Sequence, residues 1–297
     1  MLELTERQKE VLETYYDCGE NKAEGARRIG ISDSAFKKHL KQAQKKIAKN
    51  DFMEVDGEAR PHLVFSDVHA PYHHKHAIEF LSYVHKKYNC RSHVYCGGDL
   101  FDWHRASRHL SETDAMSADE ELRQAQKFSK AMSRVFPNGT LLLGNHDRIP
   151  ERQLKELGVP TSVLRDYNKL YALPSGWKVK KMYEVIKDNG LDVLNEHGDG
   201  SMGVNGCINT AIAKGCSFVQ GHTHSFPGVQ YRANHYQVIF GANSGCICDN
   251  SSLAMRYGRY AKHKPVVGCL LVYPSDGVIG AHATFLPMDL GKAKSGE

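Results

Sequence analysis

Five short segments rich in Asp, Asn and His, four of which also contain Gly, constrain this sequence more than any other feature. All five are predicted to lie where β-strands end. Because the carboxyl ends of neighbouring parallel strands meet at one edge of a sheet, their side chains are expected to converge. In chain order the segments are Ser66-Asp67-Val68-His69, Gly98-Asp99-Leu100-Phe101-Asp102, Gly144-Asn145-His146-Asp147, Glu196-His197-Gly198 and Gly221-His222-Thr223-His224.

The donor types in these segments indicate metal binding. Residues two apart on a strand point the same way, so Asp-x-His and His-x-His pairs can each hold one ion. Carboxylate and amide oxygens mixed with imidazole nitrogens suit manganese, iron, nickel or zinc rather than calcium. Seven candidate ligands are too many for one tetrahedral ion and fit two ions that share a carboxylate, with manganese favoured.

The apolar patterning predicts an α/β fold. The runs PHLVFSD, SHVYCGGD and GTLLLGNHD are separated by amphipathic stretches over about residues 75–88 and 115–135. This alternation predicts β-α-β units and a parallel sheet. After about residue 215 the pattern changes to strands and turns. We therefore expect two packed mixed β-sheets flanked by helices over residues 61–297.

The ordered set of segments is similar to the calcineurin-like metallophosphoesterase superfamily, whose pattern is D-x-H, G-D-x-x-D, G-N-H-D/E, H and G-H-x-H. All five blocks are present in that order. The intervals between Asp67, Asp99, Asn145, His197 and His222 are 32, 46, 52 and 25 residues. The resemblance covers about residues 63–224 and implies a four-layer sandwich with a binuclear metal centre.

The resemblance also implies a role for each residue of the pattern. One metal is expected on Asp67, His69 and His224, the other on Asn145, His197 and His222, with Asp99 bridging both. Two cations activate a water for attack on phosphorus and neutralise the phosphate oxygens. His146 is expected to contact the phosphate and protonate the leaving oxygen, and Asp102 to fix His146 and raise its basicity.

The residues after the second block bear on the substrate. Ser/Thr protein phosphatases have an Arg directly after the G-D-x-x-D block and a Glu at the end of the third block. Here Trp103 and Asp147 occupy those places, which disfavours close kinship with those enzymes. The segment WHRASRHL instead brings His104, Arg105 and Arg108 beside the expected metals as candidate substrate contacts.

The first fifty residues are distinct from the rest of the chain. They hold eleven Lys and Arg against eight Asp and Glu. The pattern predicts three helices, with Thr5 and Ser32 as caps of the first and third. The string ARRIGISDSAFKKHL then resembles the DNA-binding helix-turn-helix of sigma-factor and response-regulator type, and residues 51–60 are expected to form a linker.

In such helix-turn-helix domains the third helix enters the major groove. The candidate DNA contacts on it are Ser34, Lys37, Lys38 and Lys41. The alternative is a small helical packing or oligomerisation module whose lysines only face solvent. Nucleic acid, with DNA favoured, is therefore the expected partner, and a homo-oligomer stays open.

Cysteine usage and hydropathy bear on the cellular setting. No two of the eight cysteines form a C-x-x-C pair, so buried reduced thiols are expected and a structural zinc site on them is not. No run approaches the ~18 consecutive apolar residues of a membrane span. The charged N-terminus lacks an apolar signal-peptide core. We expect a soluble, cytoplasmic protein that does not insert into a membrane.

Three functions compete. The first is a two-metal phosphodiesterase, a DNA nuclease directed to its substrate by the helix-turn-helix. The second is a phosphomonoesterase or small-molecule phosphodiesterase acting on nucleotides or phosphoproteins, with a helical appendage that does not bind DNA. The third is a DNA-binding regulator with a vestigial enzyme domain, and the complete ligand set argues against it.

Overall fold

The chain forms two compact units, Met1–Ala59 and Arg60–Glu297. The computed structural model describes residues 5–18, 21–43, 60–107, 115–188, 190–198, 200–252 and 262–289. Among the described helices, none combines the length and apolar character that crossing a membrane would require.

The N-terminal unit is helical over its described residues. It contains α1 (Glu6–Asp17), α2 (Lys22–Arg28) and a helix over residues 33–43. Thr5 and Gln8 form a capping box at the start of α1, since each side chain accepts a hydrogen bond from the backbone N–H of the other. Ser32 Oγ accepts the N–H of Ala35 at 3.2 Å and so caps the third helix. Both predicted caps are confirmed.

A small apolar cluster holds these helices together. Its buried members come from all three helices and are Val11, Tyr15, Ala26, Phe36 and Leu40. Gly25 lets α2 approach the third helix closely, because a Cβ at that position would lie 2.6 Å from Cζ of Phe36. The helical spacing of apolar residues also predicts that Leu4 and Ile47 face inward, and both lie outside the described residues.

The larger unit contains two mixed β-sheets. The six-stranded sheet has the order β11-β10-β1-β2-β3-β4, in which β1 to β4 are parallel and β10 is antiparallel to both of its neighbours, β1 and β11. Its strands are β1 (His62–Phe65), β2 (His93–Cys96), β3 (Asn138–Leu142), β4 (Trp177–Lys180), β10 (Gly268–Tyr273) and β11 (His282–Pro287).

The five-stranded sheet has the order β5-β6-β7-β9-β8, in which β6, β7 and β9 are parallel. Its strands are β5 (Tyr183–Asp188), β6 (Leu191–Glu196), β7 (Ser217–Gln220), β8 (Gly228–Ala233) and β9 (Val238–Asn243). The helical elements are α4 (Ala77–Lys87), η1 (His104–Ala106), α5 (Ala118–Val135), α6 (Ile149–Glu156), η2 (Thr161–Val163), α7 (Tyr167–Leu170) and α8 (Gly206–Lys214).

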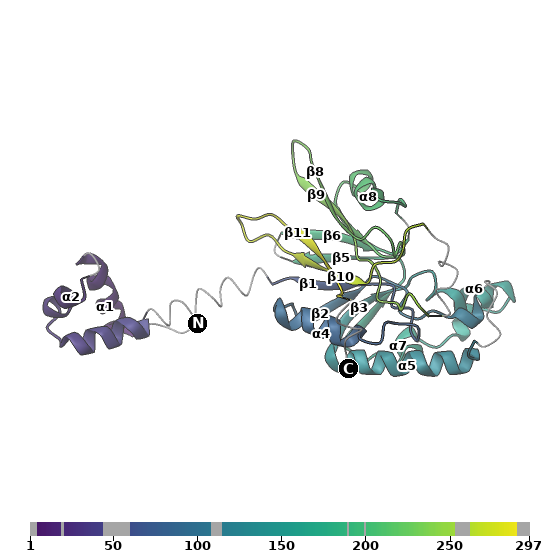
Figure 1. Ribbon diagram of the computed structural model, residues 1–297, viewed down its shortest axis with the longest axis horizontal. Helices are drawn as coiled ribbons and strands as arrows, with labels where there is room; N and C mark the ends of the chain where they lie inside the picture. The colour runs from purple at the N-terminus through teal and green to yellow at the C-terminus, as the bar shows by residue number, and fades with distance from the viewer. Residues whose placement is uncertain are drawn as a thin grey trace. The chain divides into compact units, whose positions relative to one another are not determined.

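These elements stack in four layers, visible in Figure 1 as α4 and α5, the two sheets, and α8. The β1 strand shows why, since it is buried on both faces, as central strands of covered sheets are. Leu63 and Phe65 point into the core beneath α4 and α5, whereas Val64 points into the core between the sheets. The predicted fold of two mixed sheets flanked by helices is confirmed.

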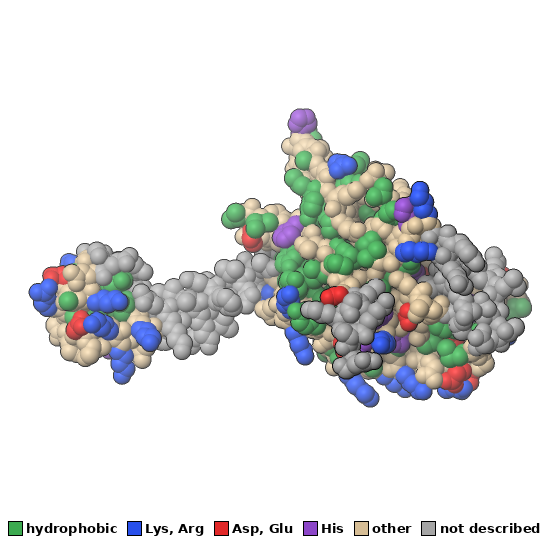
Figure 2. Space-filling model, in the orientation of Figure 1, with side chains coloured by type: hydrophobic (Ala, Val, Ile, Leu, Met, Phe, Trp, Pro, Cys, Tyr) green, Lys and Arg blue, Asp and Glu red, His purple; other side chains and the backbone are tan. Residues whose placement is uncertain are grey.

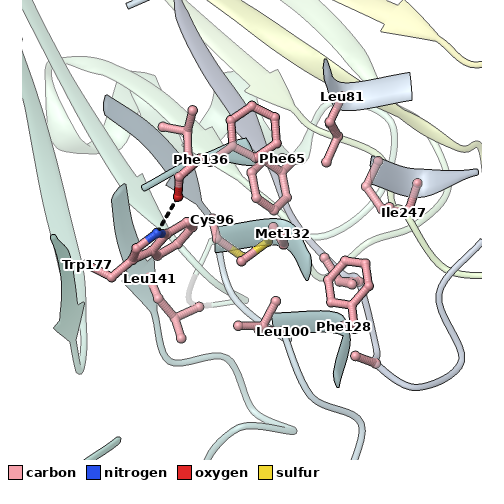
Figure 3. Close-up of a cluster of buried hydrophobic side chains, with 14 of the residues drawn as sticks. Phe65, Leu81, Cys96, Leu100, Phe128, Met132, Phe136, Leu141, Trp177 and Ile247 are labelled. Atoms are coloured by element: carbon pink, nitrogen blue, oxygen red, sulfur yellow. Dashed lines mark hydrogen bonds between the residues drawn. The ribbon is translucent and has the colours of Figure 1, made fainter. Parts of the chain in front are cut away.

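The core beneath α4 and α5 is the larger of the two (Figure 3). Leu81 of α4 and Met132 of α5 are fully buried against Phe65 of β1. Trp177 of β4 adds a polar contact, because its Nε1–H donates to the Phe136 carbonyl at 2.8 Å. This packing supports the loops that follow β1, β2 and β3.

Candidate metal centre

Five loops carry the side chains that the sequence singled out, and each follows a strand. The loops after β1, β2 and β3 belong to the six-stranded sheet, and those after β6 and β7 belong to the five-stranded sheet. Because the strands within each set are parallel, their carboxyl ends lie together. The loops of the two sheets therefore meet at one centre.

The first group of donors consists of Asp67, His69 and His224, whose ligand atoms lie within 4.8 Å of one another. The Nε2 atom of His224 lies 3.1 Å from Asp67 Oδ1 and 3.2 Å from Nε2 of His69. Two imidazole nitrogens and a carboxylate oxygen thus face one point from two different sheets.

The second group consists of Asp99, His197 and His222, and it meets the same distance limit. His197 Nδ1–H donates to the Gly97 carbonyl at 2.7 Å, which turns Nε2 toward Asp99. That Nε2 lies 3.0 Å from Asp99 Oδ2 yet forms no hydrogen bond, although it is buried. Such an orphaned nitrogen beside a carboxylate is what a metal ligand presents.

Asp99 links the two groups. Its Oδ2 atom also lies 3.9 Å from Nε2 of His69 in the first group. Its Oδ1 atom accepts the backbone N–H of His146 at 2.8 Å. The arrangement, together with the mixed oxygen and nitrogen donors, fits two divalent cations that share one carboxylate.

His146 lies against the first group, with its ring centroid 4.6 Å from that of His69. Its Nδ1–H donates to the backbone carbonyl of Asp102 at 2.7 Å. The Asp102 carboxylate lies 3.2 Å from the same nitrogen but makes its shorter contact, 2.6 Å, with Nδ1 of His69. Asp102 therefore orients both histidines, whereas the sequence paired it with His146 alone.

Two glycines of the blocks pack directly against the shared and neighbouring carboxylates. A Cβ at Gly144 would lie 2.1 Å from Asp99 Oδ1, and a Cβ at Gly221 would lie 2.4 Å from Asp67 Oδ2. Gly98 faces His197 just as closely. These positions are glycine because the candidate ligands occupy the space a side chain would need.

Several candidate ligands have left-handed backbone conformations, which non-glycine residues rarely adopt. The φ angles are 53° at Asp67, 51° at His69, 50° at Asp99 and 72° at His222. Each such residue costs about 1–3 kcal/mol and persists only where its surroundings hold it. The N–H groups of Asp67 and His69 donate to the carbonyls of Gly98 and Asp99, both at 2.9 Å, and provide that restraint.

The electrostatics show a centre that attracts positive charge. Burial alone would lower the pKa of His197, but the carboxylates of Asp99 and Asp67 raise it to about 9. Burial would raise the pKa of Asp99, yet the imidazoles of His197 and His146 hold it below its usual range. Protons thus occupy positions where bound cations would lie.

The remaining predicted site residues are placed differently. Asn145, between Gly144 and His146, is exposed, and its role as a metal ligand stays a prediction. His104 is buried, with its ring 5.9 Å from Tyr72, whereas Arg105 is exposed. Arg108 lies outside the described residues. In the N-terminal unit, Ser34, Lys37, Lys38 and Lys41 are all exposed.

Two buried carboxylates support the site although the sequence did not predict this role for them. Asp147 accepts the N–H groups of Leu100, Phe101 and Gly144, as well as the Tyr171 hydroxyl at 2.9 Å. It therefore ties the loop after β2 to the loop after β3. Burial and the nearby Asp99 raise its pKa to about 6. The position of Asp147 inside the third block was the sequence signal that could have indicated this role.

The second carboxylate is Glu121 of α5. It accepts the backbone N–H groups of His104 at 2.6 Å and Arg105 at 3.0 Å, and so holds the start of η1. The available signal was an acidic residue on the buried side of an amphipathic helix.

The fold and the two linked donor groups define a binuclear metallohydrolase. The sequence model of the calcineurin-like phosphoesterase family matches residues 61–235, which is more than half of the chain. The protein therefore belongs to the calcineurin-like phosphoesterase family and is a metal-dependent phosphoesterase. A search among curated proteins finds no match. The matched range begins after the N-terminal helices, so their binding to DNA stays a prediction.

Proposed function

We propose that this protein is a two-metal phosphodiesterase that cleaves DNA, to which its N-terminal helices bind. The observation that carries the proposal is the pairing of two features in one chain. One is the phosphoesterase domain, in which Asn145 beside His146 is exposed, and the other is a helix with three exposed lysines, Lys37, Lys38 and Lys41. Exposed lysines neutralise backbone phosphates of a long polymer.

The lysine face belongs to a folded scaffold. The helix over residues 33–43 buries Phe36 and Leu40 on one side and leaves the lysines on the other. Figure 2 shows Lys and Arg side chains at the surface of this unit. Lys37 pairs with Asp33 at 2.5 Å, an exposed contact that a phosphate can replace at little cost.

The two donor groups suggest the ligand assignment. We propose that Asp67, His69 and His224 hold one cation and that Asn145, His197 and His222 hold the other. Asp99 contacts both groups and is the shared ligand. Manganese is the favoured metal because carboxylate, amide and imidazole donors suit it.

When bound, the two cations supply an activated water and stabilise charge on the phosphate. The protein orients the reacting groups. Asp102 accepts a hydrogen bond from Nδ1–H of His69, which leaves the His69 Nε2 lone pair facing the donor group. The restrained backbone of Asp67 and Asp99 keeps both carboxylates in place without reorganisation during the reaction.

His146 is the proposed proton donor to the leaving oxygen. Its Nδ1–H is held by the Asp102 carbonyl, so Nε2 is the nitrogen left to transfer a proton. Burial would lower the pKa of His146, but Asp99 and Asp102 raise it above its usual value and so favour the protonated ring. A protonated imidazole can then give Nε2–H to the departing oxygen.

We propose Arg105 as a contact for the substrate beyond the scissile phosphate. Its side chain is exposed, while Glu121 anchors its backbone beside Asp102. A guanidinium group can grip a neighbouring phosphate bidentately. Arg108 is proposed for the same role from its sequence position.

The test is hydrolysis by the full-length protein in manganese. Single- and double-stranded DNA, bis(p-nitrophenyl) phosphate and p-nitrophenyl phosphate are compared with the wild type and with Asp99→Asn. We expect cleavage of DNA and of the diester, abolished in Asp99→Asn. Hydrolysis of the monoester alone would refute the nuclease and support a phosphomonoesterase.

A further inference from the structure

Two buried thiols lie beside His224, on the side of its ring that faces away from the donor groups. Cys246 and Cys248 are fully buried in the segment after β9. Their Sγ atoms and a ring nitrogen of His224 lie within 4.8 Å of one another. The two cysteines project together because residues two apart in an extended segment point the same way. Ile247 between them points into the core beneath α4 and α5.

Hydrogen bonds on both sides fix the backbone that carries these thiols. The N–H of Ile247 donates to the Asp67 carbonyl at 3.0 Å, and the N–H of Cys246 donates to the Val266 carbonyl at 3.1 Å. The Cys246 carbonyl accepts the N–H of Gly268 at 2.9 Å. The sulfurs are therefore held on a rigid part of the fold, as a metal site requires.

The distances match those between ligands of a small cation. Cys248 Sγ lies 3.9 Å from His224 Nδ1 and 3.7 Å from Asn250 Oδ1. Around a tetrahedral zinc ion, with Zn–S about 2.3 Å and Zn–N about 2.0–2.1 Å, sulfur and nitrogen ligands lie about 3.6 Å apart. The two distances from Cys248 Sγ are within a few tenths of an ångström of that separation, and Cys246 Sγ lies within 4.8 Å of both Cys248 Sγ and the His224 ring nitrogen.

We propose that Cys246, Cys248 and Nδ1 of His224 form a separate site for a thiophilic divalent cation such as zinc, with the amide oxygen of Asn250 as fourth donor. Soft sulfur ligands select zinc, cobalt or cadmium over manganese. On binding, each thiol releases its proton to solvent. Asn250 is exposed, so the cation has an entry route.

The shared imidazole gives this site a consequence for catalysis, which rests on the proposed function. Nε2 of His224 faces Asp67 and His69, while Nδ1 faces Cys248. A neutral imidazole has one free lone pair, because its other nitrogen carries the proton. A cation on Nδ1 therefore withdraws His224 from the proposed manganese centre, and excess zinc inhibits.

In the first experiment, the full-length protein is titrated with cobalt and monitored by absorption spectroscopy. The titration continues past the two equivalents of cobalt that a binuclear centre binds. We expect a thiolate-to-cobalt charge-transfer band in the wild type that also appears in Asp99→Asn. It should be absent from the double variant Cys246→Ala with Cys248→Ala. A wild type without this band, or a band that persists in the double variant, overturns the proposal.

The matched control is a second pair of neighbouring buried thiols, Cys90 and Cys269, for which no imidazole partner is found among the described residues. The variant Cys90→Ala with Cys269→Ala should keep the band. A further measurement on the wild-type protein does not depend on whether the variants fold. X-ray absorption of the zinc-loaded wild type should show sulfur at about 2.3 Å, and a shell of nitrogen and oxygen only would overturn the proposal.

Inhibition is tested separately with manganese-loaded protein and bis(p-nitrophenyl) phosphate. Added zinc should inhibit the wild type at least about tenfold more potently than the Cys246→Ala, Cys248→Ala variant. Equal inhibition of both proteins would overturn the coupling through His224. If no protein hydrolyses the diester, the proposed function fails, while the cobalt and zinc spectra still decide the thiol site.

Discussion

The two units of this protein show how differently structure supports a catalytic site and a binding surface. In the larger unit, loops from two sheets bring buried carboxylates and imidazoles within hydrogen-bonding distance. In the N-terminal unit, the candidate DNA contacts are exposed lysines on one helix. One of them, Lys37, pairs with Asp33, and among the described residues no contact of these lysines reveals their role.

The difference follows from what each task needs. A catalytic centre requires groups fixed relative to one another, so its geometry is visible before any ligand binds. A phosphate-binding face requires only charge spread over an exposed surface, and the same lysines would serve solubility equally well. Experiments on the first should therefore produce large effects and experiments on the second small ones.

The largest effect is expected for Asp99→Asn. Removing the charge shared by both donor groups should lower turnover at least about 10³-fold, because metal stabilisation supplies several kcal/mol. Metal content measured by mass spectrometry should fall with it. Asp192→Asn, an exposed carboxylate on β6, is the matched control and should retain activity. A fully active Asp99→Asn would remove the basis of the site.

The next largest effect is expected for His146→Gln. This change should lower turnover of DNA about 10²–10⁴-fold, as the loss of other general acids does. The loss should be much smaller on bis(p-nitrophenyl) phosphate, because p-nitrophenolate leaves without a proton. His235→Gln, at an exposed histidine, serves as the control. Equal losses on both substrates would show that His146 does not donate a proton.

Gly144→Ala tests whether the glycines set the ligand geometry. The new Cβ would lie 2.1 Å from Asp99 Oδ1, so the carboxylate must move. A displacement of about 1 Å at a catalytic group costs about 10²-fold in turnover. Gly280→Ala meets no atom within 4 Å and should have wild-type kinetics. Wild-type turnover in Gly144→Ala would contradict the packing described.

Metal affinity should depend on pH through His197. In the metal-free protein, burial alone would lower the pKa of His197. The carboxylates of Asp99 and Asp67 outweigh this effect and raise the pKa to about 9. The ring is therefore protonated at pH 7, and a cation must displace that proton. Affinity should weaken about tenfold for each unit that pH falls below 9. Calorimetry in buffers of different ionisation enthalpy should detect the released proton, and a pH-independent affinity would contradict the shift.

The smallest effect is expected in the N-terminal unit. Replacing Lys37, Lys38 and Lys41 together by Ala should reduce the salt dependence of DNA binding. The log–log slope should fall by about 0.9 for each backbone phosphate that the variant no longer neutralises. Hydrolysis of bis(p-nitrophenyl) phosphate should not change. Replacing Lys86 and Lys87, exposed on α4, is the control for net charge. An unchanged salt slope would favour the packing-module alternative.

The sequence predicted some elements well and passed over others for identifiable reasons. The strands β1, β2 and β3 contain the apolar runs LVF, VYC and LL, whose consecutive residues are buried on both faces, which makes the strands conspicuous. The strands β4, β5 and β6 consist of the segments WKVK, YEVIKD and LDVLNE. Within these segments, apolar residues alternate with polar or charged residues on a partly solvated surface. Only their period of two could have revealed them.

What the sequence by itself determined was the kind of chemistry, because donor types and their local spacing are properties of the chain. Asp67 and His69 can be recognised as a pair from two residues of separation. The tertiary structure alone decided which distant groups meet, because those distances depend on how two sheets pack. It directed the Asp102 carboxylate to His69, buried His104, and brought Cys248 to the free nitrogen of His224.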